Sequence, residues 1–214
     1  MDAPLAERLG AMADDVRRLA PQFAQIVDRL VERLQTSGAG ISAPKVGEVM
    51  PPFVLSDDNG RLVSLDQLLA KGKVAIAFHR GHWCPYCVIN AEALAQVSCK
   101  VSEAGGQLVA ITPETQKYTR QLKAETGADF PILTDLDNGY ALELDLAIRI
   151  DDIKRRGMVE AGWDIANYND NDEWILPIPA TFVVGQDGRV LGRFVDPDYR
   201  KRMDVEDLLE ALRR

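Results

Sequence analysis

Two cysteines three residues apart, Cys84 and Cys87, are the residues in this sequence best suited to carry chemistry. At this spacing on a helix, their Cβ atoms would lie about 5–6 Å apart on one face, so a modest adjustment closes a disulfide. The motif CPYC follows directly on the apolar run Lys73 to Phe78, which places it on a strand-to-helix turn. Such a pair predicts thiol–disulfide redox chemistry.

The two thiols differ in their distance from the predicted start of a helix. Unpaired backbone N–H groups and the helix dipole favour negative charge there and lower the pKa of a thiol. Cys84 lies nearer the predicted helix N-terminus than Cys87, so we expect Cys84 to be the nucleophile, with a lowered pKa. Pro85 fits the first turn, because its missing N–H costs no hydrogen bond at that position.

Positively charged side chains precede the motif. His79, Arg80 and His82 stand just before Cys84 and include the only two histidines of the chain. Arg80 is always charged and His82 can be, so either could stabilise a thiolate if its side chain turns inward. His79 follows the strand directly and is expected to be structural, and Trp83 is expected to form a wall of the site.

A metal site is the alternative from a different class of protein. His82, Cys84 and Cys87 could together hold copper or zinc. There is no second CxxC motif and no further histidine to complete four ligands. We therefore expect no metal and no other cofactor.

A second feature is the segment LPIPATF, Leu176 to Phe182, in which a proline stands immediately before a β-prone run. X–Pro is the one peptide bond for which the cis form costs little. A cis turn could place backbone groups beside the dithiol, where they would bind a substrate. The alternative is an ordinary edge proline at the start of a strand.

The rest of the chain alternates short apolar runs with helical patterns. Strands are predicted at 53–55, 73–78, 107–111, 130–133, 181–184 and 189–195. Helices are predicted at 84–101, 115–126, 138–146 and 204–213. This order predicts the α/β class, with a mixed central sheet flanked by helices on both sides. Cys99, between Val97 and Val101 on the first of these helices, is expected to be a buried core thiol.

The N-terminal segment is a candidate helical arm. Apolar residues recur at steps of three and four from Leu5 to Leu34, and Pro21 should break the helix. A Gly- and Pro-rich linker follows, so we predict an arm with its linker at 1–40 and a catalytic domain at 45–214. We expect the arm to pack on its own domain, and a homodimer contact is the alternative. The acidic insert at 147–174 is expected to be a surface loop, with a lid or partner surface as the alternative.

Composition limits the partners. The net charge of −8 argues against nucleic acids and anionic membranes, which are bound by clustered Lys and Arg. The first residues carry acids without an uninterrupted apolar run, and no segment is long enough to span a bilayer, so a cytoplasmic protein is expected. Three cysteines are too few for a disulfide scaffold.

Four segments carry a resemblance to a known family: FHRGHWCPYC (78–87), LPIPATFVV (176–184), DGRVLGRF (187–194) and VDPDYRKR (195–202). They resemble the alkyl hydroperoxide reductase and thiol-specific antioxidant (AhpC/TSA) family, in its peroxiredoxin-like branch of the thioredoxin superfamily. The resemblance runs from about Gly47 to the C-terminus and leaves the arm uncovered. It implies a thioredoxin-like fold, an attacking Cys84, a resolving Cys87 and a cis Pro179 facing them. CPYC also resembles the glutaredoxin active site.

Two family positions differ in this chain. The threonine three residues before the attacking cysteine is replaced by Gly81, and the second arginine by Pro179. Arg80 and His82 would then have to polarise the O–O bond.

The resemblance implies a thiol-dependent antioxidant enzyme. Cys84 would be oxidised by a peroxide, Cys87 would close a disulfide, and an external thiol such as thioredoxin, glutaredoxin or glutathione would reduce it. Disulfide reduction of the thioredoxin or glutaredoxin type is the alternative. The residues expected to line the substrate site are Trp83, Pro85, Tyr86 and Pro179.

Overall fold

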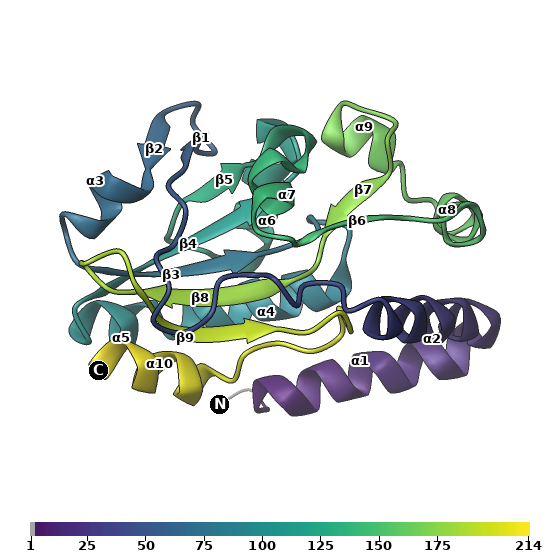
Figure 1. Ribbon diagram of the computed structural model, residues 1–214. Coiled ribbons are helices and arrows are strands. Elements are labelled where there is room, and N and C mark those ends of the chain that lie inside the picture. Colours follow the sequence, from purple (N-terminus) through teal and green to yellow (C-terminus); the bar gives the residue numbers. More distant parts are fainter. Residues whose placement is uncertain (1–2) are drawn as a thin grey trace.

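The structure is a computed structural model that describes residues 3–214. Its centre is a seven-stranded sheet in the order β2-β1-β5-β4-β3-β8-β9, and β6 and β7 form a separate pair (Figure 1). The strands are β1 (Val54–Ser56), β2 (Leu62–Ser64), β3 (Lys73–Phe78), β4 (Gly106–Thr112), β5 (Ile132–Thr134), β6 (Ala147–Arg149), β7 (Ile175–Pro177), β8 (Ala180–Val184) and β9 (Val190–Val195). β3 pairs parallel with β4 and antiparallel with β8, so the predicted mixed sheet is confirmed.

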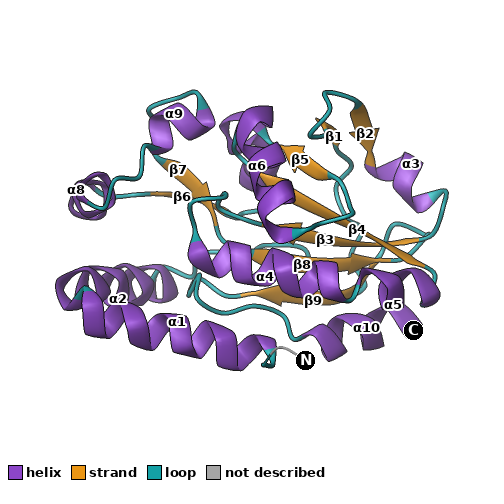
Figure 2. Cartoon of the chain, turned by 180° about the vertical axis from the view of Figure 1, so that it is seen from behind, coloured by secondary structure: helices purple, strands orange, loops and turns teal. Residues whose placement is uncertain are grey.

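Helices cover both faces of the sheet (Figures 1 and 2). They are α1 (Leu5–Leu19), α2 (Pro21–Thr36), α3 (Leu65–Leu69), α4 (Pro85–Gln96), α5 (Ser98–Glu103), α6 (Gln116–Thr126), α7 (Gly139–Glu143), α8 (Asp152–Glu160), α9 (Ile165–Asn169) and α10 (Val205–Arg213). β3 alternates between the two cores, because successive side chains of a strand point to opposite faces. Ile76 and Phe78 pack on the side of α3 and α7, whereas Ala75 and Ala77 pack on the side of α4, α6 and α10.

The single helix predicted at 84–101 is wrong. The chain leaves helical geometry at Val97 (φ −112°, ψ 5°), which separates α4 from α5. After this break α5 buries Val101, while Cys99 is exposed. The expectation that Cys99 is a core thiol is therefore wrong, because Cys99 stands two residues before the buried Val101, about 200° around the helix from it, and so faces outward.

The arm forms two helices that lie against the rest of the chain. Pro21 occupies the first turn of α2, and the helix breaks at Ala20, as its fixed φ and missing N–H predict. α1 contacts α4, and α2 contacts α8. Leu9 and Val27 belong to the same buried cluster as Cys84, so the arm covers the helix that carries the motif. The division into 1–40 and 45–214 stays a prediction, since the two parts share this cluster.

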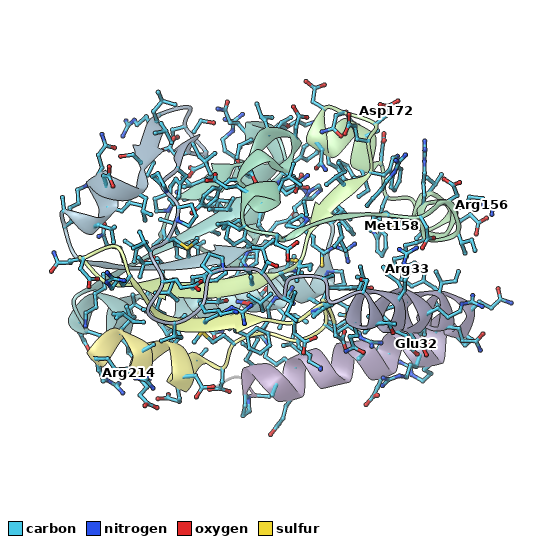
Figure 3. All side chains as sticks on the ribbon, in the orientation of Figure 1. Glu32, Arg33, Arg156, Met158, Asp172 and Arg214 are labelled. Carbon is cyan, nitrogen blue, oxygen red and sulfur yellow. The ribbon has the colours of Figure 1, made fainter. Side chains whose placement is uncertain are left out.

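The insert at 147–174 is not the surface loop that was expected. β6 and β7 pair antiparallel at its ends, and α8 and α9 lie between them. Met158 and Trp174 are buried, because the insert packs its own apolar residues into the larger core. Figure 3 shows α8, with Met158, above α2, with Arg33, and Arg33 forms an ion pair of 3.0 Å with Asp151.

Among the described residues, no helix has the length and apolar character needed to cross a membrane.

Candidate active site

The motif lies where the sequence predicts it. β3 ends at Phe78, Cys84 is the N-cap of α4, and Pro85 opens the helix. Both thiols are buried, with 1% of Cys84 and none of Cys87 exposed, and neither is in a disulfide. The strand-to-helix turn is thus confirmed, but it does not present the thiols at the surface.

Hydrogen-bond donors converge on Cys87. Its Sγ accepts from the backbone N–H of Arg80 and from Nη2 of Arg202, both at 3.3 Å. The Cys84 thiol donates a third hydrogen bond to it. Burial opposes ionisation, but the bond from Cys84 and the charge of Arg202 outweigh it and lower the pKa of Cys87 to about 6. The arrangement therefore places the thiolate on Cys87.

Cys84 has the opposite surroundings. Burial raises the pKa of Cys84, its hydrogen bond to Cys87 raises it further, and the charge of Arg80 only partly opposes these effects. The predicted lowering of the Cys84 pKa is wrong. Although Cys84 is the N-cap of α4, its side chain makes no capping bond to the helix, so the helix N–H groups do not stabilise its thiolate.

Arg80 lies beside the two thiols, as expected. It is 1% exposed, and its guanidinium carbon lies 4.2 Å from the centre of the Tyr199 ring and 5.3 Å from that of Trp83. These are cation–π distances. Two of its nitrogens, Nε and Nη2, have no hydrogen-bond partner among the described residues. Arg80 therefore combines a fixed positive charge with free donors next to buried sulfur.

His82 faces away from the thiols. Its Nδ1 lies 2.7 Å from Oε1 of Glu114, and its backbone N–H donates to Oε2 of the same carboxyl group at 2.8 Å. The ring stacks on Tyr118, with centroids 4.9 Å apart, and meets Tyr168 edge-on at 4.8 Å. Burial raises the pKa of Glu114, and the contacts with His82 oppose that rise. The expectation that His82 supports the thiolate is not met, because this buried carboxyl group holds it instead.

Gly81 explains the missing threonine in steric terms. Its φ is +136°, a conformation that side chains disfavour. A Cβ at this position would lie 2.5 Å from Oε1 of Glu114 and 2.7 Å from Nε1 of Trp83. No threonine hydroxyl can therefore stand beside the thiols at residue 81.

Aromatic residues of the motif wall the buried thiols. The Trp83 ring lies 5.2 Å from that of Trp163, in the insert, so Trp83 forms a wall as expected. Tyr86 is buried and meets Tyr199 edge-on at 5.7 Å. Burial raises the pKa of Tyr86 to about 12, which keeps its hydroxyl neutral.

Pro179 departs from expectation. The described chain contains no cis peptide bond, so the predicted cis Pro179 is wrong. Only two residues join β7 to β8, and Pro179 is buried between them. The trans form of an X–Pro peptide bond is favoured by about 0.5–1 kcal/mol, and the cis form is typical of tight turns. Here the chain passes from one strand into the next.

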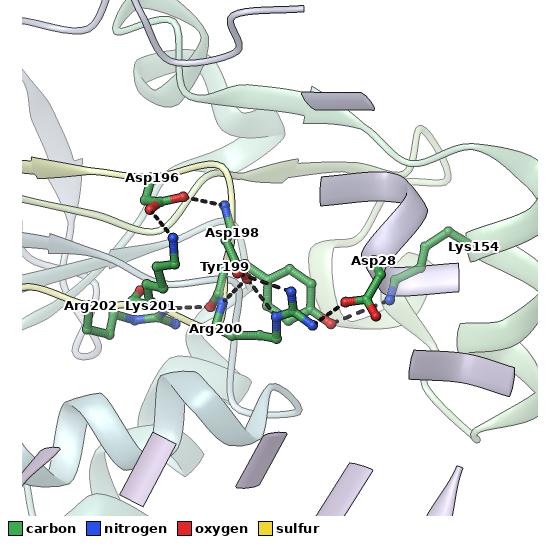
Figure 4. A network of polar contacts seen from close by, with 8 residues as sticks. All are labelled: Asp28, Lys154, Asp196, Asp198, Tyr199, Arg200, Lys201 and Arg202. Atoms are coloured by element: carbon green, nitrogen blue, oxygen red, sulfur yellow. Dashed lines mark hydrogen bonds and ion pairs between the residues drawn. The ribbon is translucent and has the colours of Figure 1, made fainter. Parts of the chain in front are cut away.

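The segment after β9 supplies residues that the sequence analysis did not assign (Figure 4). Arg202 reaches Cys87, and Tyr199 lies under Arg80. Arg200 binds Asp198 at 2.7 Å and Asp28 of α2 at 2.6 Å, which ties this segment to the arm. The basic run Arg200 to Arg202 in an acidic chain was the available signal.

Two other residues of this region are buried. His79 was expected to be structural, whereas nothing in the sequence indicated that Lys154 would be buried. His79 is fully buried, and burial together with the charge of Arg202 lowers its pKa to about 3, in keeping with a structural residue. Lys154 of α8 is 1% exposed and lies 3.5 Å from the Tyr199 hydroxyl. Nothing in its neighbouring sequence pointed to the thiols. Within the described part of the chain, no three His, Cys, Asp or Glu residues are arranged to hold a metal ion.

Several known proteins are similar to this chain. The Redoxin family model matches residues 45–212. A protein named as peroxiredoxin bcp in Coxiella burnetii is 27% identical over 151 residues, covering 70% of this chain and 97% of that protein. The thiol-disulfide oxidoreductase ResA of Bacillus subtilis is 25% identical over 154 residues, covering 72% of this chain and 69% of ResA.

Among solved structures, peroxidoxin BcpB of Mycobacterium tuberculosis superposes with a TM-score of 0.62 at 20% identity. The match covers 79% of this chain and 97% of that one. The predicted thioredoxin-like fold is thereby confirmed.

Proposed function

The chain belongs to the Redoxin family, and we propose that Cys84 and Cys87 reduce peroxides by cycling between a dithiol and a disulfide. The enzyme is a thiol-dependent oxidoreductase. The observation that carries the peroxidase function is the burial of both thiols beside the guanidinium of Arg80, two of whose nitrogens lack a partner among the described residues. A buried donor of this kind is suited to stabilise the oxygen anion that develops when an O–O bond breaks.

The hydrogen bond between the thiols suggests an order of events. The Cys87 thiolate takes the proton of Cys84 as the Cys84 sulfur attacks the O–O bond. Cys84 becomes a sulfenic acid, and the other oxygen of the peroxide leaves as an alkoxide or hydroxide, which must still take up one proton. Cys87 then attacks the sulfenic sulfur, which closes the disulfide and releases water. Cys84 is thus proposed as the attacking residue because a base adjoins it; its pKa is the higher of the two, so the proton transfer to Cys87 runs uphill and forms part of the barrier.

The size of the substrate distinguishes the two enzyme functions. A protein disulfide needs the attacking sulfur to be accessible, whereas only 1% of Cys84 is exposed. A hydroperoxide is small enough to reach a buried sulfur after a local rearrangement. Burial therefore supports peroxide reduction over the thioredoxin-like alternative.

An external thiol must return the disulfide to the dithiol. A small thiol of the glutathione type would reach the buried sulfurs most easily, thioredoxin or glutaredoxin would serve once the cover over the disulfide opens, and a reducing compartment such as the cytoplasm would supply them. The apolar face of the arm is used within the chain, so we do not propose a homodimer through that face.

The deciding experiment compares two oxidants on the fully reduced protein by stopped flow. We expect hydrogen peroxide to oxidise Cys84 at least about a hundredfold faster than it oxidises a free thiolate, a barrier lowered by about 2.7 kcal/mol. A small disulfide should react no faster than it does with a free thiolate. Fast exchange with the disulfide, together with only the free-thiol rate with peroxide, would replace the peroxidase by a disulfide reductase.

A further inference from the structure

Lys154 is a buried cation that the mechanism above does not use. Its helix, α8, belongs to the insert, and only 1% of the residue is exposed. Its Nζ lies 3.5 Å from the Tyr199 hydroxyl, 3.9 Å from the centre of the Phe23 ring and 5.4 Å from that of Tyr199 (Figure 4). Within the described chain, no carboxylate forms an ion pair with it. Burying an ammonium group without a paired opposite charge costs free energy of folding.

The protonation of Lys154 depends on the charges of Arg80 and Cys84. Burial and the charge of Arg80 lower the pKa of Lys154 to about 6, and a thiolate at Cys84 acts in the opposite direction. The other charged or titratable groups that face it are Arg200 and Tyr199, with Asp151 at the start of its own helix. α2 presents the Phe23 ring to it, and Asp28 of that helix is engaged by Arg200. Lys154 can therefore gain or lose a proton as the site reacts.

We propose that Lys154 gives a proton to the oxygen that leaves when Cys84 cleaves a peroxide. The proposal rests on the peroxidase function. Arg80 can stabilise the developing anion, but a guanidinium does not give up a proton in proteins. His82 is held by Glu114, and burial raises the pKa of Tyr199, which makes it a poor acid. Lys154 remains as the donor beside Arg80 and Tyr199.

The step balances in protons and electrons. Before it, Cys84 is a thiol, Cys87 a thiolate and Lys154 an ammonium group, with a hydroperoxide ROOH. After it, Cys84 is a sulfenic acid, Cys87 a thiol and Lys154 a neutral amine, and ROH has left. The S–O bond forms as the O–O bond breaks, so the Cys84 sulfur loses two electrons and the peroxide gains them. The amine takes a proton from water before the next turnover.

Two substitutions separate proton donation from charge and from structure. Lys154→Met removes the proton and the charge at similar length, and Lys154→Arg keeps the charge but cannot release a proton. The matched control is Arg156→Met, which removes an exposed cation of the same helix (Figure 3). The readout is the single-turnover rate of Cys84 oxidation by hydrogen peroxide across pH, beside the rate with an aromatic disulfide, whose leaving thiolate needs no proton.

We expect Lys154→Met to slow the peroxide reaction about a hundredfold, at the low end of what a general acid contributes, and to leave the disulfide reaction within about twofold. Lys154→Arg should not restore the peroxide rate, and Arg156→Met should not change it. Because the pKa of Lys154 is lowered to about 6, the wild-type rate should fall as the pH rises above about 6 and Lys154 loses its proton, and neither Lys154 variant should show that fall.

Other outcomes overturn the proposal. Restoration by Lys154→Arg would show that charge alone acts, and an unchanged rate in Lys154→Met would remove Lys154 from the reaction. If Lys154→Met does not fold, by circular dichroism, then Lys154→Arg and the wild-type pH profile decide. A wild-type protein no faster with peroxide than a free thiol would instead overturn the peroxidase function, so the two failures are distinguishable.

Discussion

The two ends of the CPYC motif lie in different surroundings. Both sulfurs lie in one buried cluster with side chains of the arm and the C-terminal segment, but Cys87 accepts hydrogen bonds from Arg80, Arg202 and Cys84, whereas Cys84 donates its hydrogen bond to Cys87. A helix N-terminus is worth about 0.3–1 kcal/mol to a nearby negative charge. A hydrogen bond from a charged donor is worth about 1.5–3 kcal/mol. In this protein, the packing around the CxxC pair therefore has more influence than distance from the helix end on which sulfur holds the negative charge.

The largest expected effect comes from removing one sulfur at a time. Cys84→Ser should abolish turnover, because the attacking atom is lost. Cys87→Ser should also stop turnover, yet still react once with peroxide, more slowly than wild type because the base beside Cys84 is gone. Mass spectrometry after dimedone trapping would detect the sulfenic acid. A single turnover in Cys84→Ser and none in Cys87→Ser would reverse the two roles.

Arg80→Met tests the cation that both thiols share. We expect the peroxide rate to fall by about two to three orders of magnitude, the loss typical of removing one preorganised donor. The rate with a small disulfide should fall far less, because no oxygen anion develops in that reaction. Stopped-flow rates with both oxidants check this. An equal fall in both would indicate a general loss of thiolate, and no fall would leave Arg80 without a role in the reaction.

Arg202→Met sharpens the comparison on the Cys87 side. Without the guanidinium, the pKa of Cys87 should rise toward its ordinary value, since the charge of Arg202 is one of the causes of its lowering. At neutral pH, a rise of the Cys87 pKa by about two units would leave about a tenth of the thiolate, so we expect about a tenfold lower rate of Cys84 oxidation. Ultraviolet thiolate absorbance against pH measures the shift. Lys201→Met is the control, because Lys201 is exposed and binds Asp196 instead. An equal shift in both variants would mean that long-range charge, and not the contact, is responsible.

The dependence of stability on pH tests the same thiolate in the absence of any oxidant. A folded-state pKa of about 6 for Cys87 lies below its ordinary value, so the unfolded state binds more protons between the two values. Stability should therefore rise with pH from about pH 6 to pH 8.5, by at most about 1.4 kcal/mol per pH unit from this thiol. Lys154, whose pKa is also lowered to about 6, adds to the rise.

Urea unfolding of variants isolates the contribution of Cys87. Cys87→Ala should flatten the rise in part, and Cys99→Ala, at an exposed thiol, should leave it as in the wild type. A slope unchanged by Cys87→Ala would contradict a thiolate at that residue.

The sequence predicts best what local signals specify. The strand predicted at 73–78 and the helices predicted at 115–126 and 204–213 occur as β3, α6 and α10, and local residues set their limits: a left-handed Gly127 ends α6 and Asp204 caps α10. Arg202 contacts Cys87, and Lys154 contacts Tyr199, only through tertiary packing. The basic run at 200–202 made Arg202 noticeable but did not indicate which residue it contacts.

The errors for Cys99 and His82 have different origins. Cys99 is exposed because it stands two residues before the buried Val101, about 200° around the helix from it, which spacing alone predicts. The direction of His82 is set by Glu114, which stands 32 positions further along the chain. Long-range partners of this kind cannot be read from spacing.

The cover that α1 and α2 form over the dithiol makes these sulfurs reporters of local unfolding. A thiol reagent too bulky to enter can modify Cys84 only in molecules whose cover has opened. Its modification rate, divided by the rate for a free thiolate at the same pH, then gives the equilibrium constant for opening when closing is fast. The exposed Cys99 provides an internal reference in the same chain. Denaturant dependence of this ratio would distinguish a small movement of the arm from unfolding of the whole domain, because the slope scales with the surface exposed.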